Sequence, residues 1–244
     1  MKKRLKAFSV ILLKIFLYFF GISILSTIIF RFVPIPFTPL MITRCVEQKM
    51  DGKAMKLDKD WVPIEEISPN LQLAVVCSED QQFLNHFGFD FDAIEKAYKF
   101  NKKKKKSKPI KGASTISQQV AKNVFLWQGR SWLRKGFEVY FTLLIETIWS
   151  KERIMEVYLN VIEMGDGIYG AQAAAKTFYK KDAKKLSMGE AATIAACLPN
   201  PIKWTPRNPS NYIYKKQKWI LRQMANQGGR IDYDAKSEES ESKN

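Results

Sequence analysis

The sequence contains only one histidine, His86, among 244 residues. A multi-histidine metal cage is therefore excluded, and any Ser-His-Asp triad would have to use this single ring. The three cysteines, Cys45, Cys77 and Cys197, lie far apart and form no CxxC pair. Neither a zinc ribbon nor a disulfide framework can be inferred from them. Any acid–base chemistry is left to carboxylates.

Positive charge, in contrast, is abundant. The chain has 40 Lys and Arg against 24 Asp and Glu, which gives a formal net charge of +16. A hydrophobic content of 46% and an aromatic content of 13% exclude a disordered chain. The length suffices for one substantial core or two small ones. The charge is distributed unevenly, so each basic block has to be interpreted by itself.

Residues 8–30 form a long apolar run that contains one charge, Lys14. A helix of about 23 residues rises roughly 34 Å, which is enough to cross a bilayer. Basic residues precede the run, so the positive-inside rule predicts a cytoplasmic tail at 1–7 and an extracytoplasmic remainder. A cleaved signal peptide is the competing interpretation. We favour the uncleaved anchor, because the run is too long for a typical h-region and no A-x-A-like site follows it.

Two further segments flank the expected globular domain. Residues 31–60 are predicted to be a membrane-proximal linker, in which the apolar side chains of Phe37, Leu40, Met41 and Ile42 rest in the outer leaflet. The chain from Ala235 onward is almost entirely Ser, Glu and Lys. We therefore predict a disordered tail at 231–244.

A second basic block runs from Lys102 to Lys106 and continues with Lys108 and Lys111. On charge alone it indicates a solvated surface loop. Nucleic acid is not favoured as a partner, because the block is predicted to be extracytoplasmic and contains no interleaved aromatic residue. Anionic lipid headgroups or a ligand with a pyrophosphate group fit it better.

The region from 61 to 230 has mostly helical periodicity, little strand alternation and no repeat. Ser68-Pro69-Asn70 is typical of a helix start, and Thr115 with Gln118 fits a capping box. The chain is predicted to be mainly α. The expected helices are Leu71 to His86, Thr115 to Leu126, Trp132 to Trp149, Lys151 to Met164, Gly170 to Phe178, Ser187 to Cys197 and Tyr212 to Gln227.

Glu79 is the first candidate for acid–base work. In the helix predicted from Leu71, the side chains of Glu79, Phe83 and His86 follow at i, i+4 and i+7 and would form one stripe. The stripe would present a carboxylate, an aromatic wall and an imidazole together. A purely structural acid is an equally good interpretation at this point.

Glu138 is the second candidate, since Arg134 and Arg130 precede it by four and eight residues on the same expected face. Taken alone, Arg134 and Glu138 are better explained as an ordinary surface ion pair. Between the two glutamates, Gln119 and Lys122 share a helix face that capping does not account for.

Five motifs in order resemble those of the peptidoglycan glycosyltransferases, family 51, and the short anchored architecture is similar to the monofunctional members of that family. The resemblance covers roughly Trp61 to Trp219. The motifs are Glu79-Asp-Gln-Gln-Phe-Leu-Asn-His-Phe-Gly88, Gly112-Ala-Ser-Thr-Ile-Ser-Gln-Gln119, Arg134-Lys-Gly-Phe-Glu138, Lys151-Glu-Arg-Ile-Met-Glu-Val-Tyr-Leu-Asn160 and Ala191-Ala-Thr-Ile-Ala-Ala-Cys-Leu-Pro199.

The resemblance implies a lysozyme-like helical glycosyltransferase domain at 61–230 with a small membrane-proximal lobe. It further implies polymerisation of lipid II: a GlcNAc 4-hydroxyl attacks the anomeric carbon of MurNAc, inverts it to a β-1,4 bond and expels undecaprenyl diphosphate. The implied partners are lipid II, the growing glycan, membrane lipids and other cell-wall or division proteins. The implied location is the cell (inner) membrane, with the catalytic domain in the periplasm.

The resemblance also assigns roles to residues. Glu79 matches the general base, and Glu138 matches a donor-side glutamate that either orients cations or holds a divalent ion, Mg²⁺ or Mn²⁺, at the diphosphate; no cofactor is implied to be obligatory. The substrate-binding positions are Ser114, Thr115, Gln118, Gln119, Lys122, Arg130, Arg134 and Lys135. The supporting positions are Asp80, Phe83, His86, Glu156 and Asn160.

Two other functions stay open on the residues alone. One is a muramidase or lytic transglycosylase that cuts finished glycan and needs no cationic diphosphate site. The other is a non-catalytic scaffold of the cell envelope, in which Glu79 would be replaceable.

Overall fold

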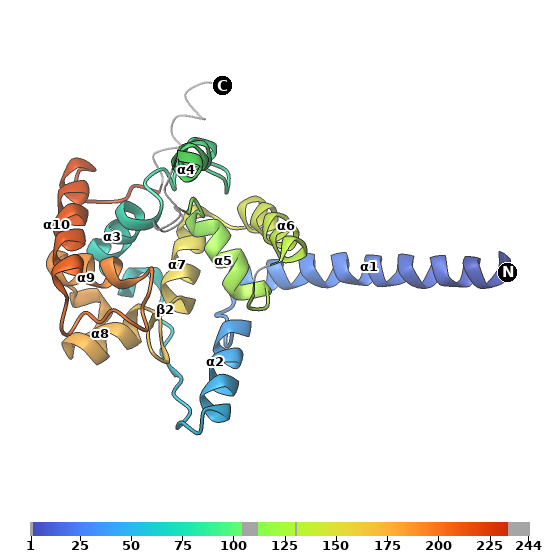
Figure 1. Cartoon of the computed structure of the whole chain (residues 1–244), viewed down its shortest axis with the longest axis horizontal. Helices are drawn as coiled ribbons and strands as arrows, with labels where there is room; N and C mark the ends of the chain where they lie inside the picture. The colour runs from blue at the N-terminus through green and yellow to red at the C-terminus, as the bar shows by residue number, and fades with distance from the viewer. Residues whose placement is uncertain (1, 104–111, 130, 234–244) are drawn as a thin grey trace.

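The computed structural model describes residues 2–103, 112–129 and 131–233. Most of them are helical, and one long helix, α1 (Lys2–Phe32), extends from the body of the protein to the N-terminus (Figure 1). The prediction of a mainly α fold with an N-terminal membrane-spanning helix is confirmed.

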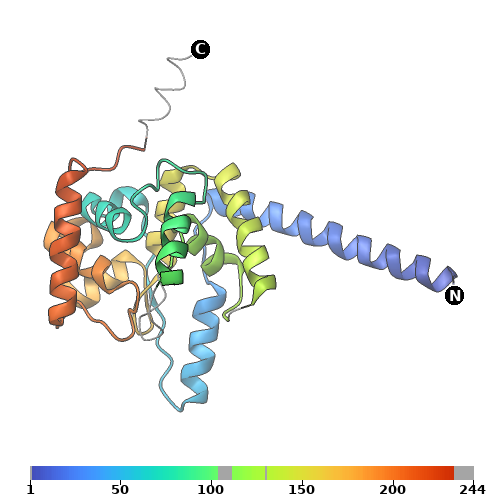
Figure 2. The ribbon, with the colours of Figure 1, turned by 45° about the horizontal axis from the view of Figure 1, so that its top comes forward.

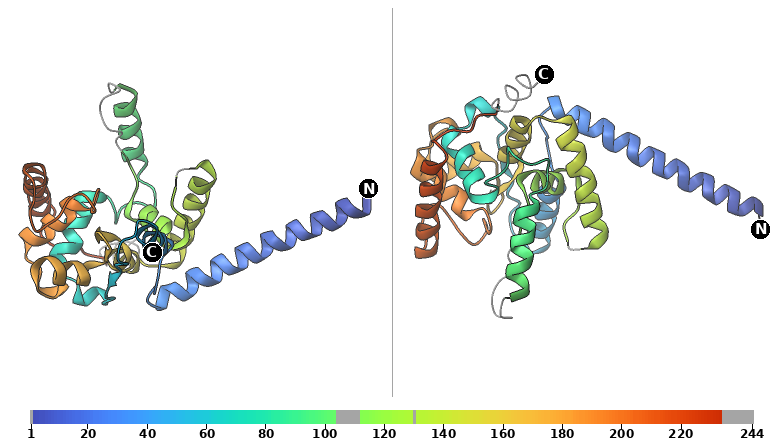
Figure 3. Two further views of the ribbon diagram at one scale, coloured as in Figure 1. Left: turned by 60° about the horizontal axis from the view of Figure 1, so that its bottom comes forward. Right: turned by 90° about the horizontal axis from the view of Figure 1, so that it is seen from above.

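Helix α1 meets the length and composition of a membrane span over Ser9–Phe32, with a mean hydropathy of 2.1. Its first part extends away from the body in every view, whereas its last turns lie against helix α6 (Trp132–Ile148) (Figure 3). There the Ser23 hydroxyl lies 2.6 Å from the Tyr140 hydroxyl. The Trp149 indole N–H donates to the Thr27 carbonyl at 2.7 Å. The anchor is thus packed into the globular part.

The segment predicted to be a linker contains a helix, α2 (Pro39–Met50), and a short strand, β1 (Asp58–Lys59). Thr38 is the N-cap of α2, since its hydroxyl accepts from the Met41 N–H at 3.3 Å. The side chains of Leu40 and Met41 are buried in the protein. The expectation that these two rest in the outer leaflet is therefore wrong, because α2 turns them into the core.

The remaining helices begin mostly at Ser or Thr caps, as their sequences indicate. Thr115 and Gln118 form the predicted capping box, with both reciprocal hydrogen bonds present. These helices are α3 (Pro69–Glu79), α4 (Phe91–Lys103), α5 (Ile116–Phe125), α7 (Lys151–Val161), α8 (Ala171–Tyr179), α9 (Met188–Cys197) and α10 (Asn211–Asn226), with short 3₁₀ turns at Ile64–Glu66 and Ala183–Lys185.

Strand content is small. Strand β3 (Ile168–Tyr169) lies between β1 and β2 (Glu163–Gly165), parallel to the first and antiparallel to the second. Helix α3 packs against α9 and α10, and α5 packs against α6 and α7 (Figure 2). A continuous core joins the two groups. The C-terminal end of α3 and the N-terminal part of α5 meet at the surface between them.

The helix predicted from Leu71 to His86 is wrong in its second half, since α3 ends at Glu79. Asp80 leaves the helical conformation and its carboxylate accepts from the Ile116 N–H at 3.0 Å, at the start of α5. A tertiary contact thus ends a helix that no glycine or proline stops. Helix α4 is an additional element that the sequence analysis did not predict. Lys102 and Lys103 of the basic block belong to it, whereas Lys104–Lys106, Lys108 and Lys111 lie outside the described residues.

Candidate active site

Glu79 is the last residue of α3, and its carboxylate is held by uncharged donors. The Gln119 amide donates to Oε2 at 3.0 Å, and the Ser78 hydroxyl lies 3.3 Å from Oε1. The orientation of the Gln119 amide is fixed by a second contact, because the Tyr158 hydroxyl donates to Gln119 Oε1 at 3.4 Å. Burial and the nearby carboxylates raise the pKa of Tyr158 well above its usual value, so it stays a neutral donor.

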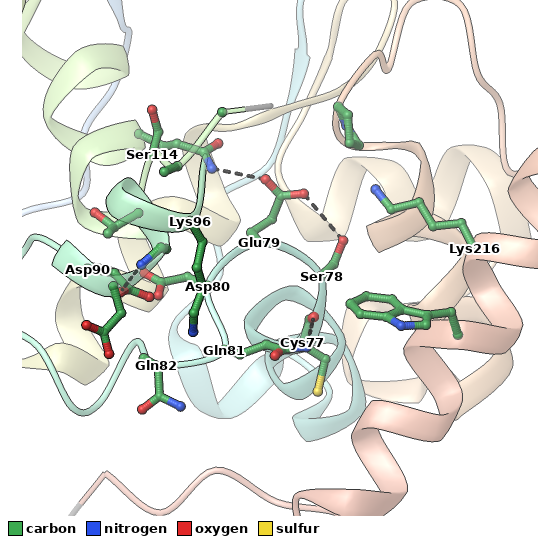
Figure 4. A pocket seen from close by; sticks show the side chains of 18 of the residues that line it. Cys77, Ser78, Glu79, Asp80, Gln81, Gln82, Asp90, Lys96, Ser114 and Lys216 are labelled. Carbon is green, nitrogen blue, oxygen red and sulfur yellow. Dashed lines mark hydrogen bonds between the residues drawn. The ribbon is translucent and has the colours of Figure 1, made fainter. Parts of the chain in front are cut away.

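A cleft of about 1080 Å³ opens in front of Glu79. Figure 4 shows Glu79 near its centre, with Ser114 on the α5 side and Lys216 reaching in from α10. The volume is of the size that binds a sizeable ligand. The lining residues are Cys77, Ser78, Glu79, Asp80, Gln81, Gln82, Asp90, Asp92, Ala93, Lys96, Gly112, Ala113, Ser114, Thr115, Gln119, Pro199, Tyr212, Lys216 and Trp219.

The predicted stripe of Glu79, Phe83 and His86 is wrong, because the helix ends before the last two. Phe83 is fully buried in the core and does not line the cleft. The His86 Nε2 lies 2.9 Å from Asp80 Oδ1, and both side chains are nearly inaccessible. Asp80 thus bridges His86 and the start of α5. These residues shape the turn after Glu79, which fits their predicted supporting role.

Glycine at position 88 closes this turn. Gly88 has a φ of +77°, and a Cβ there would lie 2.7 Å from the Thr142 methyl group, so a side chain would be both strained and obstructed. Its carbonyl accepts from the Thr115 hydroxyl at 2.7 Å. The motif around Glu79 is in this way fixed to the motif that begins α5.

A cationic cluster lies beside Glu79 on the α5–α6 side. Glu138 is buried, and its carboxylate contacts Lys135 Nζ at 2.5 Å and Arg134 at 3.8 Å. Lys122 lies three residues after Gln119 in α5, on the same helix face. The structure therefore brings together Lys122, Arg134, Lys135 and Glu138, as predicted; Arg130 lies outside the described residues. None of these four side chains lines the cleft itself, so the cluster borders the cleft beyond Gln119.

Burial lowers the pKa of Lys122, and the charges of Arg134 and Lys135 lower it as well. The carboxylates of Glu138 and Glu79 act in the opposite direction. The negative charges of both glutamates therefore act on the Lys122 ammonium. A partly dehydrated cation flanked by two more is suited to an anion with several oxygens.

The other predicted binding residues of the α5 motif divide into two groups. Ser114 is exposed in the cleft, and Thr115 lines its wall while capping α5. Gln118 is buried in the capping box and does not line the cleft. Capping thus accounts for Gln118, and we do not include it among the proposed substrate contacts.

Sequence analysis missed the opposite wall of the cleft. Lys216 and Trp219 come from α10, and Lys96 comes from α4. Burial lowers the pKa of Lys216, while the charge of Glu79 raises it. The spacing of residues in α10 did not indicate that Lys216 lines the cleft, because basic residues lie on several faces of this helix. Only the packing of α10 against α3 identifies the one that faces Glu79.

Glu156 and Asn160, for which a supporting role is predicted, lie in α7 and do not line the cleft. The Asn160 side chain pairs with both backbone groups of Val62, at 3.0 and 2.9 Å. Glu156 accepts from Arg153 at 2.6 Å, and burial raises the pKa of its carboxyl. The same arginine donates to the carbonyls of Phe30 and Val33 at the end of α1. Helix α7 therefore ties the end of the membrane helix to the domain.

The predicted divalent ion at Glu138 stays a prediction. Both oxygens of this carboxylate face cations, and the described residues contain no group of three His, Cys, Asp or Glu side chains that could hold a metal. The described side chains therefore do not fit a resident metal ion, and no step below is routed through one.

Comparison with known proteins gives a consistent result. A family model described as Transglycosylase matches residues 47–225. A biosynthetic peptidoglycan transglycosylase of Bacteroides thetaiotaomicron is 57% identical over 208 residues, 85% of this chain and 83% of the relative. One of Haemophilus influenzae is 53% identical over 215 residues (88% and 86%), and one of Pseudomonas putida is 52% identical over 207 residues (85% and 86%).

Proposed function

This chain belongs to the transglycosylase family and is a peptidoglycan glycosyltransferase, and we propose that it polymerises lipid II with Glu79 as the general base. The observation that carries the proposal is the position of the Glu79 carboxylate. It faces a large cleft, is held by neutral donors and has a cluster of cations beside it. The base proposed for the acceptor hydroxyl and the cations proposed for the donor diphosphate thus lie on opposite sides of Gln119.

In the proposed step, Glu79 accepts the proton of the GlcNAc 4-hydroxyl while that oxygen bonds to the anomeric carbon of the donor MurNAc. The bond from this carbon to the diphosphate oxygen breaks, and its electron pair leaves with undecaprenyl diphosphate. Attack from the face opposite the leaving group inverts the α-linked donor to a β-1,4 bond. Base and acceptor therefore lie on one side of the sugar, and the cations lie on the other.

We place the donor diphosphate at Lys122, Arg134 and Lys135, because a leaving dianion gains more from fixed positive charge than from an acid. Glu138 holds Lys135 and Arg134 in place by its two ion pairs. The acceptor enters the cleft between α3, α4 and α10, where Lys216 and Lys96 supply further positive charge. Ser114 and Thr115 line the passage between the two substrates.

The membrane helix supports the same proposal. Lipid II is held in the bilayer, and an anchored enzyme keeps its cleft close to the bilayer surface. We infer that the N-terminus is cytoplasmic and that the domain lies on the outer side of the cell (inner) membrane, in the periplasm. A glycan-cleaving enzyme would not require the cationic cluster, because it releases no diphosphate. A scaffold would not require a carboxylate base in a cleft.

Labelled lipid II given to the membrane-reconstituted protein tests the proposal, with Glu79→Gln alongside. Wild type should make long glycan strands and Glu79→Gln should not. Cleavage of finished glycan by the wild type would indicate a muramidase instead. If neither protein turned over lipid II, the scaffold would be the better description.

A further inference from the structure

A buried ion pair lies next to the turn of residues 80–88 that follows Glu79, and the proposed reaction does not use it. Glu146, in the last turn of α6, has a side chain that is 3% exposed, and its Oε1 lies 2.7 Å from Nζ of Lys151, the first residue of α7. The hydroxyl of Ser117, a fully buried residue of α5, donates to the same oxygen. A carboxylate of α6 thus joins the starts of α5 and α7.

Lys151 connects this ion pair to the turn. Its Nζ donates to the His86 carbonyl at 2.7 Å and lies 4.7 Å from the centre of the Phe83 ring. Glu146 packs against the same turn, since a Cβ at Gly88 would lie 3.0 Å from Glu146 Cγ. Both members of the ion pair therefore contact the turn.

Stability alone does not account for the ion pair. Taking two charges out of water can cost more than their attraction returns, so apolar side chains of similar volume often stabilise a core equally well. The place of Lys151 is also unfavourable in itself, because the amino end of a helix carries partial positive charge. Unlike apolar packing, the charged hydrogen bonds of Glu146 and Lys151 fix the distance and direction of the groups that they bind.

Two short series of contacts lead from the ion pair to the Glu79 carboxylate. Through Ser117 the pair holds the first turn of α5, where Gln119 donates to Glu79 Oε2 at 3.0 Å. Through the carbonyl of His86 it holds a residue whose ring Nε2 lies 2.9 Å from Asp80 Oδ1. Asp80 directly follows Glu79 in the chain. The pair thus acts both on the donor that binds the carboxylate and on the backbone that carries it.

We propose that Glu146 and Lys151 are positioning residues for Glu79. They hold the Gln119 amide and the turn after Glu79 at the separation that directs the carboxylate into the cleft. Neither side chain lines the cleft, so both act through Glu79, and the inference rests on the proposed role of Glu79 as base. A misplacement of about 1 Å at a reacting group can lower the rate about 10²-fold. Loss of the pair should therefore lower kcat and leave KM nearly unchanged.

The first test compares Lys151→Met with the double variant Glu146→Gln/Lys151→Met, both as the full chain in membranes. Lys151→Met alone leaves Glu146 buried without its cation, so the midpoint of thermal unfolding should fall by roughly 5–15 °C. The double variant has no unpaired charge and should recover most of that loss. Its kcat for labelled lipid II should stay about 10–100-fold below wild type at a similar KM. Recovery of kcat together with the midpoint would overturn the proposal, because the pair would then be only structural.

The second test asks whether the loss of rate passes through Glu79. Glu79→Gln is combined with the double variant, and kcat is measured in single turnovers. The combined variant should match Glu79→Gln alone within about two-fold, because it has no base left to direct. A merely structural role would instead lower kcat by the same factor in both backgrounds, and that result would overturn the proposal.

Ser117→Ala keeps the ion pair and removes only its contact with α5, so it tests the proposal even where the double variant fails to fold. We expect kcat to fall about five- to ten-fold at an unchanged KM, and a wild-type kcat would overturn the proposal. The matched control is Asp60→Asn/Lys176→Met, which removes an ion pair of 2.8 Å that is about half exposed and should leave kcat unchanged.

Failure of the base assignment has a different signature. Glu79→Gln would then polymerise lipid II as well as the wild type, and both the base assignment and the positioning proposal would be lost. An inactive Glu79→Gln beside a fully active double variant would remove the positioning proposal alone.

Discussion

Glu79 and Glu138 lie in neighbouring parts of the same site but in different surroundings. On the α3 side, the direct partners of Glu79 are the amide of Gln119 and the hydroxyl of Ser78. On the α6 side, Glu138 is in contact with Lys135 and Arg134. The Glu79 carboxylate lines the cleft, where it can meet a substrate hydroxyl, whereas the Glu138 carboxylate lies outside the cleft and orders the two cations that contact it. The difference in partners is the physical basis for assigning different roles to the two glutamates.

The largest difference between the two glutamates should appear when Glu79 can no longer accept a proton. Glu79→Gln keeps the size of the side chain, so we expect kcat for lipid II polymerisation to fall about 10²–10⁴-fold with little change in KM. Continuous assay with labelled lipid II measures both constants. Glu95→Gln on the exposed face of α4 is the control. A variant that kept more than about a tenth of wild-type kcat would remove Glu79 from the role of base.

The cationic side should respond in binding rather than in proton transfer. Lys122→Ala removes a half-buried ammonium from the cluster, and a charged hydrogen bond is worth about 1.5–3 kcal/mol. We expect kcat/KM to fall roughly 10–150-fold, with partial recovery in Lys122→Arg. Lys218→Ala, an exposed lysine of α10, should be neutral. If Lys218→Ala were as damaging as Lys122→Ala, general surface charge rather than the cluster would be responsible.

The lowered pKa of Lys122 predicts that binding of lipid II weakens at alkaline pH. Lys122 is charged below its pKa, and burial moves that pKa below the ordinary lysine value of 10.5. As pH rises, the charge is therefore lost while exposed lysines still keep theirs. We expect KM for lipid II to rise on the alkaline side, and Lys122→Arg to move this limit to higher pH. An unchanged profile in Lys122→Arg would show that another group titrates there.

On the α3 side, Gln119→Ala removes one neutral hydrogen bond to Glu79. We expect kcat to fall about five- to ten-fold, since such a bond contributes roughly 1 kcal/mol. Tyr158→Phe leaves Gln119 in place but frees its amide to rotate, and a smaller loss is expected. Both are measured with labelled lipid II against the wild type. A larger effect of Tyr158→Phe than of Gln119→Ala would mean that Tyr158 acts through the core instead.

The smallest effect is expected where the anchor meets α6. Ser23→Ala and Tyr140→Phe each remove one partner of the 2.6 Å contact, and each should lower stability by about 1 kcal/mol. Thermal unfolding in nanodiscs measures this. In the double variant the losses should not add, because both remove the same bond. Ser26→Ala, whose hydroxyl bonds within α1, is the control, and full additivity would show that the two side chains do not interact.

Local sequence signals were reliable where a helix is specified by its own residues. The capping box of Thr115 and Gln118 formed as predicted, and the apolar run of residues 8–30 became the greater part of α1. The prediction failed after Glu79, where nothing local stops a helix. The Asp80 carboxylate binds the Ile116 N–H and His86 instead, two partners from farther along the chain. The helix α2 within the expected linker was missed for the same kind of reason, since α2 is held by Glu163 and the core.

The sequence by itself determined the membrane helix, the mainly helical class and the order of the motifs around Glu79, Lys122 and Glu138, because periodicity and residue type act over a few turns of chain. Only the tertiary structure decided which groups meet. It placed Gln119 against Glu79 and turned Lys216 of α10 into the cleft. Those outcomes depend on how distant helices pack, and packing energy is shared among contacts that no local pattern encodes.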